Sequence, residues 1–142
     1  MKTSKLALPA FMTLLMIFSF VMTGCQTAQK PMQPQAIDVA NQAVAEAEKI
    51  PEVSKATAFV ANNKIYMGIE TSTSLAQQEA SALEEKVMNQ VKGVNSSYTP
   101  VVTTENETVS KIKGVSSAIT GGQPVASLNN EIADIEARIK QR

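Results

Sequence analysis

Hydrophobic and polar positions alternate with two different periods along this chain, beginning after a polar stretch at residues 26–35. Apolar residues three or four positions apart predict amphipathic helices, and short runs rich in β-branched and aromatic residues predict strands. The predicted order is α-β-β-α-β-α-α, with helices over 37–50, 75–92, 106–119 and 128–139 and strands over 56–61, 64–70 and 98–103. Ser72-Thr73-Ser74 and residues 104–106 offer N-caps to the second and third helices.

Turn-forming residues separate these elements. Asn62-Asn63 lies between the first two strands and tolerates positive φ, which favours a hairpin over a plain surface loop. Pro100 cannot donate to a sheet ladder, so the third strand is expected at an edge or to begin near Pro100. Gly93 is expected to stop the second helix, and Gly121-Gly122-Gln123-Pro124 is expected to separate the last two.

The expected architecture is α+β, with a small three-stranded sheet packed with helices. Covering one face of the sheet with helices is the simplest way to bury the apolar stripes. The helix between the second and third strands fits a right-handed crossover. The stripe of the last helix, with isoleucines at 132, 135 and 139, suits packing on the sheet or contact with another molecule.

The first 25 residues have the layout of a secretory signal peptide. Lys2 and Lys5 precede an apolar run from Leu6 to Met22, and Thr23-Gly24 is followed by Cys25, the single cysteine. A cysteine at this point resembles the lipobox of bacterial lipoproteins. That resemblance implies cleavage between Gly24 and Cys25 and lipid on the Cys25 thiol. The alternative, an uncleaved membrane anchor, would need a longer apolar run to cross about 30 Å of hydrocarbon.

These features divide the chain into three parts. Residues 1–24 are the expected signal peptide, residues 25–35 an acylated N-terminus and flexible tether, and residues 36–142 a single domain. Removing residues 1–24 leaves 11 basic and 13 acidic residues, a formal balance of −2. This balance argues against nucleic-acid binding.

The residue inventory also argues against an enzyme. The chain has no histidine, so the commonest general base is missing. Glu84-Glu85 and the pair Glu131 and Asp134 are expected to be solvated helix charges rather than catalytic carboxylates. Gly121-Gly122 lacks the residues of a phosphate-binding loop. We therefore expect no catalytic residues, no cofactor, no metal and no small-molecule substrate.

Several segments together resemble the sporulation lipoproteins of the YhcN/YlaJ type. Residues 50–53 match an I-x-x-V step, and residues 58–69 match a strand, an Asn-bearing turn and a Y-V-G strand, with Met67 in place of Val. Residues 119–125, followed by Glu131-Ile132 and Arg138-Ile139, match the ending I-x-x-G-x-P-V … E-I … R-I. The hairpin-helix-strand unit, with Lys92-Gly93-Val94 before the last strand, is also similar to the BON domain.

The resemblance implies a non-catalytic lipoprotein on the extracytoplasmic face of a bacterial membrane, in the forespore or spore inner membrane. Its expected role is in spore formation, germination or outgrowth, and Cys25 alone carries over as a functional residue. A BON-like module that recruits an envelope or cortex-lytic protein is the first alternative. In that case the hairpin edge or the last helix would bind the partner. A general envelope lipoprotein unrelated to sporulation is the second.

Overall fold

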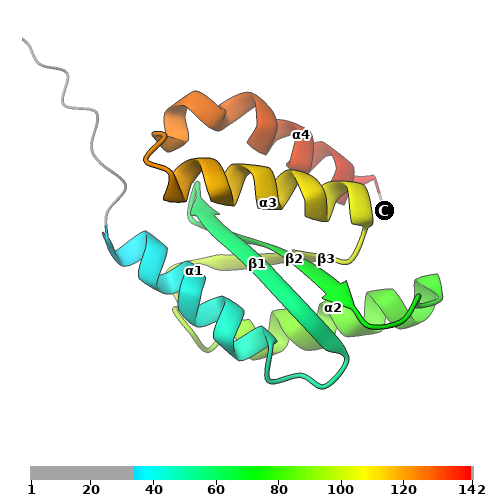
Figure 1. The fold of residues 1–142 in the computed structure, drawn as a ribbon. Helices are drawn as coiled ribbons and strands as arrows, with labels where there is room; N and C mark the ends of the chain where they lie inside the picture. Colours follow the sequence, from blue (N-terminus) through cyan, green and yellow to red (C-terminus); the bar gives the residue numbers. More distant parts are fainter. Residues whose placement is uncertain (1–33, 142) are drawn as a thin grey trace, which may run out of the picture.

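The structure is a computed structural model that describes residues 34–141. Its elements follow the predicted order α-β-β-α-β-α-α, with one short 3₁₀ helix, η1, added before the last helix (Figure 1). The helices are α1 (Pro34–Ala47), α2 (Gln77–Val91), α3 (Asn106–Thr120), η1 (Val125–Leu128) and α4 (Asn129–Lys140), and the strands are β1 (Val53–Ala61), β2 (Lys64–Thr71) and β3 (Thr99–Thr103). The predicted α+β class is therefore confirmed.

The hairpin expected at Asn62-Asn63 is present. Both asparagines have positive φ, 49° at Asn62 and 58° at Asn63. A two-residue turn of this kind matches the right-handed twist of the strands that it joins. Strand β1 pairs antiparallel with β2, and the pair next to the turn is Ala61 with Lys64. At the other end of the hairpin, the register shifts between Val53 and Lys55.

Strand β3 lies parallel to β2, and the sheet order is β1-β2-β3. Helix α2 connects β2 to β3, as a parallel pair requires. Pro100 is the second residue of β3, and β3 is an edge strand. Pro100 has no N–H to donate to a neighbouring strand. It therefore fits near the start of a strand and at the edge of the sheet, where no further strand needs that hydrogen bond.

Helices cover both faces of the sheet, so the expectation of one covered face was wrong (Figure 1). Alternate residues of β2 point to opposite sides. Ile65, Met67 and Ile69 pack with α1 and α2, whereas Tyr66 packs with α3 and α4. Strands buried on both faces have nearly continuous apolar sequences. The runs Ala58–Ala61 and Ile65–Ile69 fit that pattern better than a one-sided sheet.

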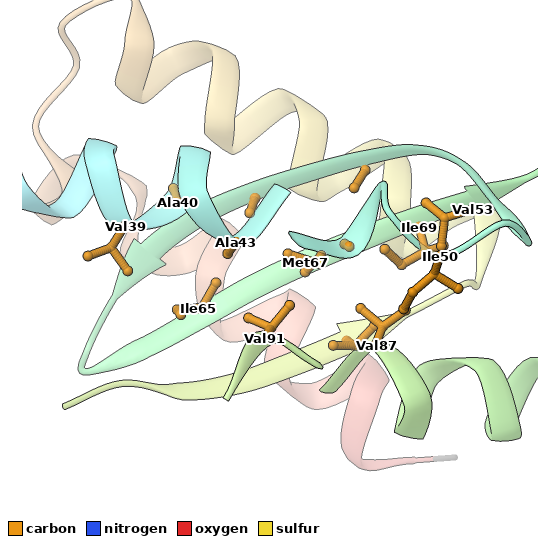
Figure 2. Close-up of a cluster of buried hydrophobic side chains, with 14 of the residues drawn as sticks. Val39, Ala40, Ala43, Ile50, Val53, Ile65, Met67, Ile69, Val87 and Val91 are labelled. Carbon is orange, nitrogen blue, oxygen red and sulfur yellow. The ribbon is translucent and has the colours of Figure 1, made fainter. Parts of the chain in front are cut away.

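The face under α1 and α2 holds the larger buried cluster (Figure 2). Small residues of α1, including Ala43 and Ala47, are fully buried and bring this helix close to β1 and β2. Val87 and Val91 of α2 are also fully buried against the same side. Burying these apolar side chains contributes roughly 25 cal/mol for each Å² removed from water.

Several element boundaries differ from the prediction, since α1 ends at Ala47 rather than at residue 50 and β1 begins at Val53 rather than at residue 56. Helix α1 begins at Pro34, so Pro34 and Gln35 belong to the helix rather than to the expected tether. Proline favours the first turn of a helix because its fixed φ is helical and its missing N–H has no partner there. Helix α2 begins after Ala76 rather than at the hydroxyl residues 72–74, and the Ala76 N–H donates to Glu79 Oε2 at 3.0 Å.

Candidate functional site

The predicted lipidation and cleavage residues, Cys25 and Gly24, lie outside the described residues. The described chain begins nine positions after Cys25, at the first turn of α1. Ile37 in this turn is the exposed large hydrophobic residue of the described part, with 37% of its surface accessible. The end of the domain nearest to Cys25 in the sequence is thus the end where α1 starts.

The last helix is not available to a partner through its isoleucine stripe. Ile132 and Ile135 of α4 and Leu128 of η1 are buried. They form one cluster with Ile112, Val115 and Ile119 of α3 and with Phe59 and Tyr66 of the sheet. The two alternatives left open for this stripe are therefore resolved, because the stripe packs within the domain over the sheet.

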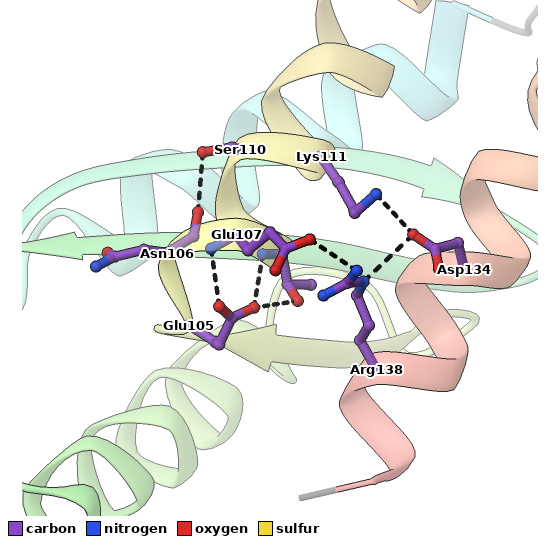
Figure 3. Close-up of polar contacts among 8 residues, drawn as sticks. Glu105, Asn106, Glu107, Ser110, Lys111, Asp134 and Arg138 are labelled. Atoms are coloured by element: carbon purple, nitrogen blue, oxygen red, sulfur yellow. Dashed lines mark hydrogen bonds and ion pairs between the residues drawn. The ribbon is translucent and has the colours of Figure 1, made fainter.

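Ion pairs attach α4 to α3 beside this cluster (Figure 3). Asp134 lies 2.8 Å from Lys111 Nζ and 3.3 Å from Arg138 Nε. Arg138 also contacts Glu107, near the start of α3, at 2.7 Å. Hydrogen bonding to Lys111 is the main cause that lowers the pKa of Asp134. These partly exposed pairs orient the helix more than they stabilise it, since exposed pairs contribute about 0–1 kcal/mol.

A second polar contact joins α4 to the sheet. Lys64 Nζ lies 2.7 Å from Glu136 Oε1, and the Tyr66 hydroxyl donates to the same oxygen. Hydrogen bonding to Lys64 and then to Tyr66 lowers the pKa of Glu136, although burial opposes this. Burial, followed by the neighbouring Glu136 carboxylate, raises the pKa of Tyr66. The Tyr66 ring stacks on Phe59 with centroids 4.8 Å apart.

Sequence reasoning missed this contact. Side chains alternate between the two faces along β2, so the sequence pattern predicts that Lys64 and Tyr66 lie on the same face of the sheet. Glu136 lies 70 residues beyond Tyr66, and no local spacing relates the two. Only the packing of α4 brings them together.

The outer edge of β1, the other predicted binding surface, is partly covered by the domain itself. The Ser116 hydroxyl on α3 donates to the Ala58 carbonyl at 3.0 Å, and the Ala56 N–H donates to Glu48 Oε1 at 3.1 Å. Side chains that occupy the free hydrogen-bonding groups of an edge strand oppose the addition of another strand. The hairpin edge is therefore a poor docking surface.

An open groove of about 530 Å³ lies between α3 and α4. Val115 and Leu128 supply apolar lining, and Lys111, Glu131 and Asp134 supply charged groups. Gly114 also lines the groove, and a Cβ added there would meet no atom within 4 Å. The groove combines accessible volume, apolar lining and charged groups.

The carboxylates that the sequence analysis set aside do not form a reactive pair. Glu84 Oε1 accepts hydrogen bonds from the Thr104 N–H and hydroxyl at 2.7 and 2.8 Å. Asp134 is held by the ion pairs described above, and Glu131 is exposed. Within residues 34–141, no three potential His, Cys, Asp or Glu ligands gather where they could hold a metal ion. In the same part of the chain, no helix has the length and apolar character needed to cross a membrane.

Comparison with protein families gives the assignment. The model of the family described as Sporulation lipoprotein YhcN/YlaJ matches residues 24–140. The chain belongs to this family. The match begins one residue before Cys25 and continues to the end of α4. The family description implies a lipid anchor and therefore an extracytoplasmic, membrane-attached protein.

A curated member of the family is similar to this chain. "Probable spore germination lipoprotein YlaJ" of Bacillus subtilis (strain 168) is 30% identical over 102 residues, which is 72% of this chain. The alignment covers 49% of that relative, so the chain spans about half its length.

The chain also shows a partial likeness to solved structures. Two variants of the MamM CTD, one in a copper form, are 24% and 23% identical and have TM-scores of 0.41 and 0.40. Each covers 49% of this chain, and 94% of the solved chain is matched. TM-scores at this level support no argument about fold or function.

Proposed function

We propose that this family member is anchored through lipid on Cys25 after cleavage between Gly24 and Cys25. The family match across residues 24–140, which includes Cys25, is the observation that carries the proposal. Cys25 is the single cysteine and follows a basic start and an apolar run. In this scheme residues 1–24 are removed, the chain from Cys25 to α1 is the tether, and the domain that follows carries the function.

The proposed location is the extracytoplasmic face of the forespore or spore inner membrane, with a role in spore formation, germination or outgrowth. The family description and the printed name of the Bacillus subtilis relative support this choice. A non-catalytic role fits the residues, because the chain has no histidine and the carboxylates described above are hydrogen-bonded, ion-paired or exposed. The domain is then a structural or binding element rather than an enzyme.

Substitution of Cys25 tests the anchor. Cys25→Ser removes the single thiol, so the protein should carry no lipid and cleavage between residues 24 and 25 should be blocked, which leaves the mass of the unlipidated precursor. The measurement is intact mass combined with detergent phase partitioning. Thr23→Ala leaves the thiol in place and serves as the matched control. Lipid retained on the Cys25→Ser protein would show that this residue is not the anchor.

Expression and location test the sporulation role. A C-terminal tag followed through growth and sporulation should appear in the membrane fraction of the developing spore. Deletion of the gene should delay or impair germination or outgrowth. Steady expression in growing cells, with normal spores in the deletion strain, would leave a general envelope lipoprotein.

A binding role is the second candidate, and the groove between α3 and α4 favours it. An envelope protein such as a cortex-lytic enzyme would bind against Val115 and Leu128 with charge pairing at the rim. Gly114→Gln would fill the open space in the groove without touching the core. Loss of one specific co-purifying envelope protein with Gly114→Gln, but not with Ser110→Gln on an exposed face of the same helix, would support the role.

A further inference from the structure

We propose that one end of the domain rests on the bilayer surface, with the acidic opposite end directed away from it. The contacting end, here called the near end, consists of the start of α1, the hairpin turn and two loops (residues 34–38, 62–64, 92–99 and 119–127). The inference rests on the proposed lipidation of Cys25 and goes beyond it, because an anchor alone does not orient a domain.

The direction of each element places these segments together. Strand β1 ends and β2 begins at the Asn62-Asn63 turn, and the Thr99 N–H donates to the Asn63 carbonyl at 3.0 Å. Val39, near the start of α1, shares a cluster with Ile65 at the start of β2 (Figure 2). Figure 1 shows the start of α1, the end of β1 and the connection after α3 at the same end of the molecule.

Charge differs modestly between the two ends. The near-end segments contain Asp38, Lys64 and Lys92, and Lys64 is ion-paired with Glu136 of α4, so these four charges cancel. The opposite, far end (residues 46–53, 70–80, 103–108 and 138–141) contains three bases and seven acids, and Lys86 and Lys113 from outside these segments pair with Glu52 and Glu70, which leaves −2. The seven acids are Glu46, Glu48, Glu52, Glu70, Glu79, Glu105 and Glu107. Anionic headgroups repel acidic groups within about 10 Å at 0.1 M salt, so the far end is disfavoured at the bilayer.

The length of chain before α1 restricts the orientation independently of charge. Cys25 is nine positions before Pro34. At about 3.3–3.6 Å for each residue, this segment reaches roughly 30 Å at most. A domain of this size is about 35 Å across, from a radius of gyration near 13 Å. Because the segment joins the near end, it keeps that end within roughly 30 Å of the bilayer, and placing the far end on the bilayer would require the segment to be almost fully extended.

The near end also offers apolar contact. Ile37 is the exposed large hydrophobic residue of the described part, and Val94 and Tyr98 are partly exposed at the same end. Tyrosine suits the headgroup region because its ring is apolar and its hydroxyl is polar. Such contacts are weak alone, but a short tether holds the surface at a high effective concentration.

Single tryptophans can report the orientation, because the chain contains none. The lipidated protein carrying Ile37→Trp is reconstituted into phosphatidylethanolamine–phosphatidylglycerol vesicles with brominated or ordinary acyl chains. The matched control is Gln78→Trp, an exposed position in the first turn of α2 at the far end. Bromine should quench roughly half of the Ile37→Trp emission, since interfacial groups lie about 5–10 Å into the headgroup and acyl boundary. It should leave Gln78→Trp unchanged.

Each result has a distinct meaning. Tyr98→Trp is a second near-end reporter and should also be quenched, which guards against a local fault at residue 37. Two results, in protein that carries lipid and floats with vesicles, would overturn the orientation and leave the anchor intact. One is equal quenching at positions 37 and 78, and the other is no quenching at positions 37 and 98. Protein without lipid by intact mass overturns both proposals.

Discussion

Two glycine-to-alanine substitutions should change stability in opposite directions. Gly68 lies in β2 beneath α3, and a Cβ added there would lie 3.1, 3.2 and 3.3 Å from Val109 Cγ1, Cα and Cγ2. Val109 is buried, and one of the three contacts is to backbone, so α3 would have to move away from the sheet. Gly114 lies in the same helix, and an added Cβ there meets nothing within 4 Å.

The magnitudes follow from these surroundings. Overpacking of this kind costs about 1–3 kcal/mol. Removing glycine from a strand returns about 0.5–1 kcal/mol, so Gly68→Ala should lower the free energy of unfolding by about 1–2 kcal/mol. Gly114→Ala gains helix propensity without a clash and should raise the free energy of unfolding by about 1 kcal/mol. For a domain of roughly this size, each 1 kcal/mol shifts Tm by about 4–8 °C.

The assay is urea and thermal unfolding of residues 26–142, followed by far-ultraviolet circular dichroism. A second substitution tests the cause. Val109→Ala removes two of the three contacting atoms, so Gly68→Ala should cost less in the Val109→Ala background than alone. The reasoning fails if Gly68→Ala is neutral or stabilising, or if the two losses add within about 0.5 kcal/mol, as they do for independent sites.

The remaining predictions concern burial and charge. Ile65→Asp should lower the free energy of unfolding of the same fragment by several kcal/mol, because Ile65 is fully buried. The control Ile37→Asp changes an exposed residue and should leave Tm nearly unchanged. Similar Tm values for the two variants would place Ile65 outside the core. Glu136, whose pKa is lowered from 4.5 by Lys64 and Tyr66, contributes stability that is present at neutral pH and is lost as the pH falls below 4.5 toward its folded pKa. Glu136→Gln should therefore be less stable than the wild type at pH 7, and the difference between their urea midpoints should be smaller at pH 3. A difference that does not change with pH would contradict this.

Local sequence determined most of the secondary structure. The Asn62-Asn63 turn, the edge position of Pro100 and the break after α3 follow from the φ values and hydrogen-bonding groups of individual residues. These effects act between neighbours in the chain, so a single sequence contains them. The start of α2 was predicted less well because three hydroxyl residues offered caps and the helix begins after Ala76 instead.

The second covered face of the sheet was not recognised, although the signal was present. Residues 58–61 and 65–69 are apolar at successive positions, which indicates burial on both sides. The apolar surfaces of four amphipathic helices are also larger than one face of a sheet of three short strands can cover. A sheet covered on one face would leave part of these apolar surfaces in contact with water, which is the physical reason that both faces are covered.

The sequence by itself determined the order of elements, the resemblance to the sporulation lipoproteins and the cysteine at the expected anchor. Only the tertiary structure decided that α4 packs inward, that Glu136 meets Lys64 and Tyr66, and that acidic residues from three separate segments lie at one end. Turns and caps depend on residues a few positions apart. Packing and surface charge depend on groups that are distant in the chain, and their positions are fixed only when the helices fold onto the sheet.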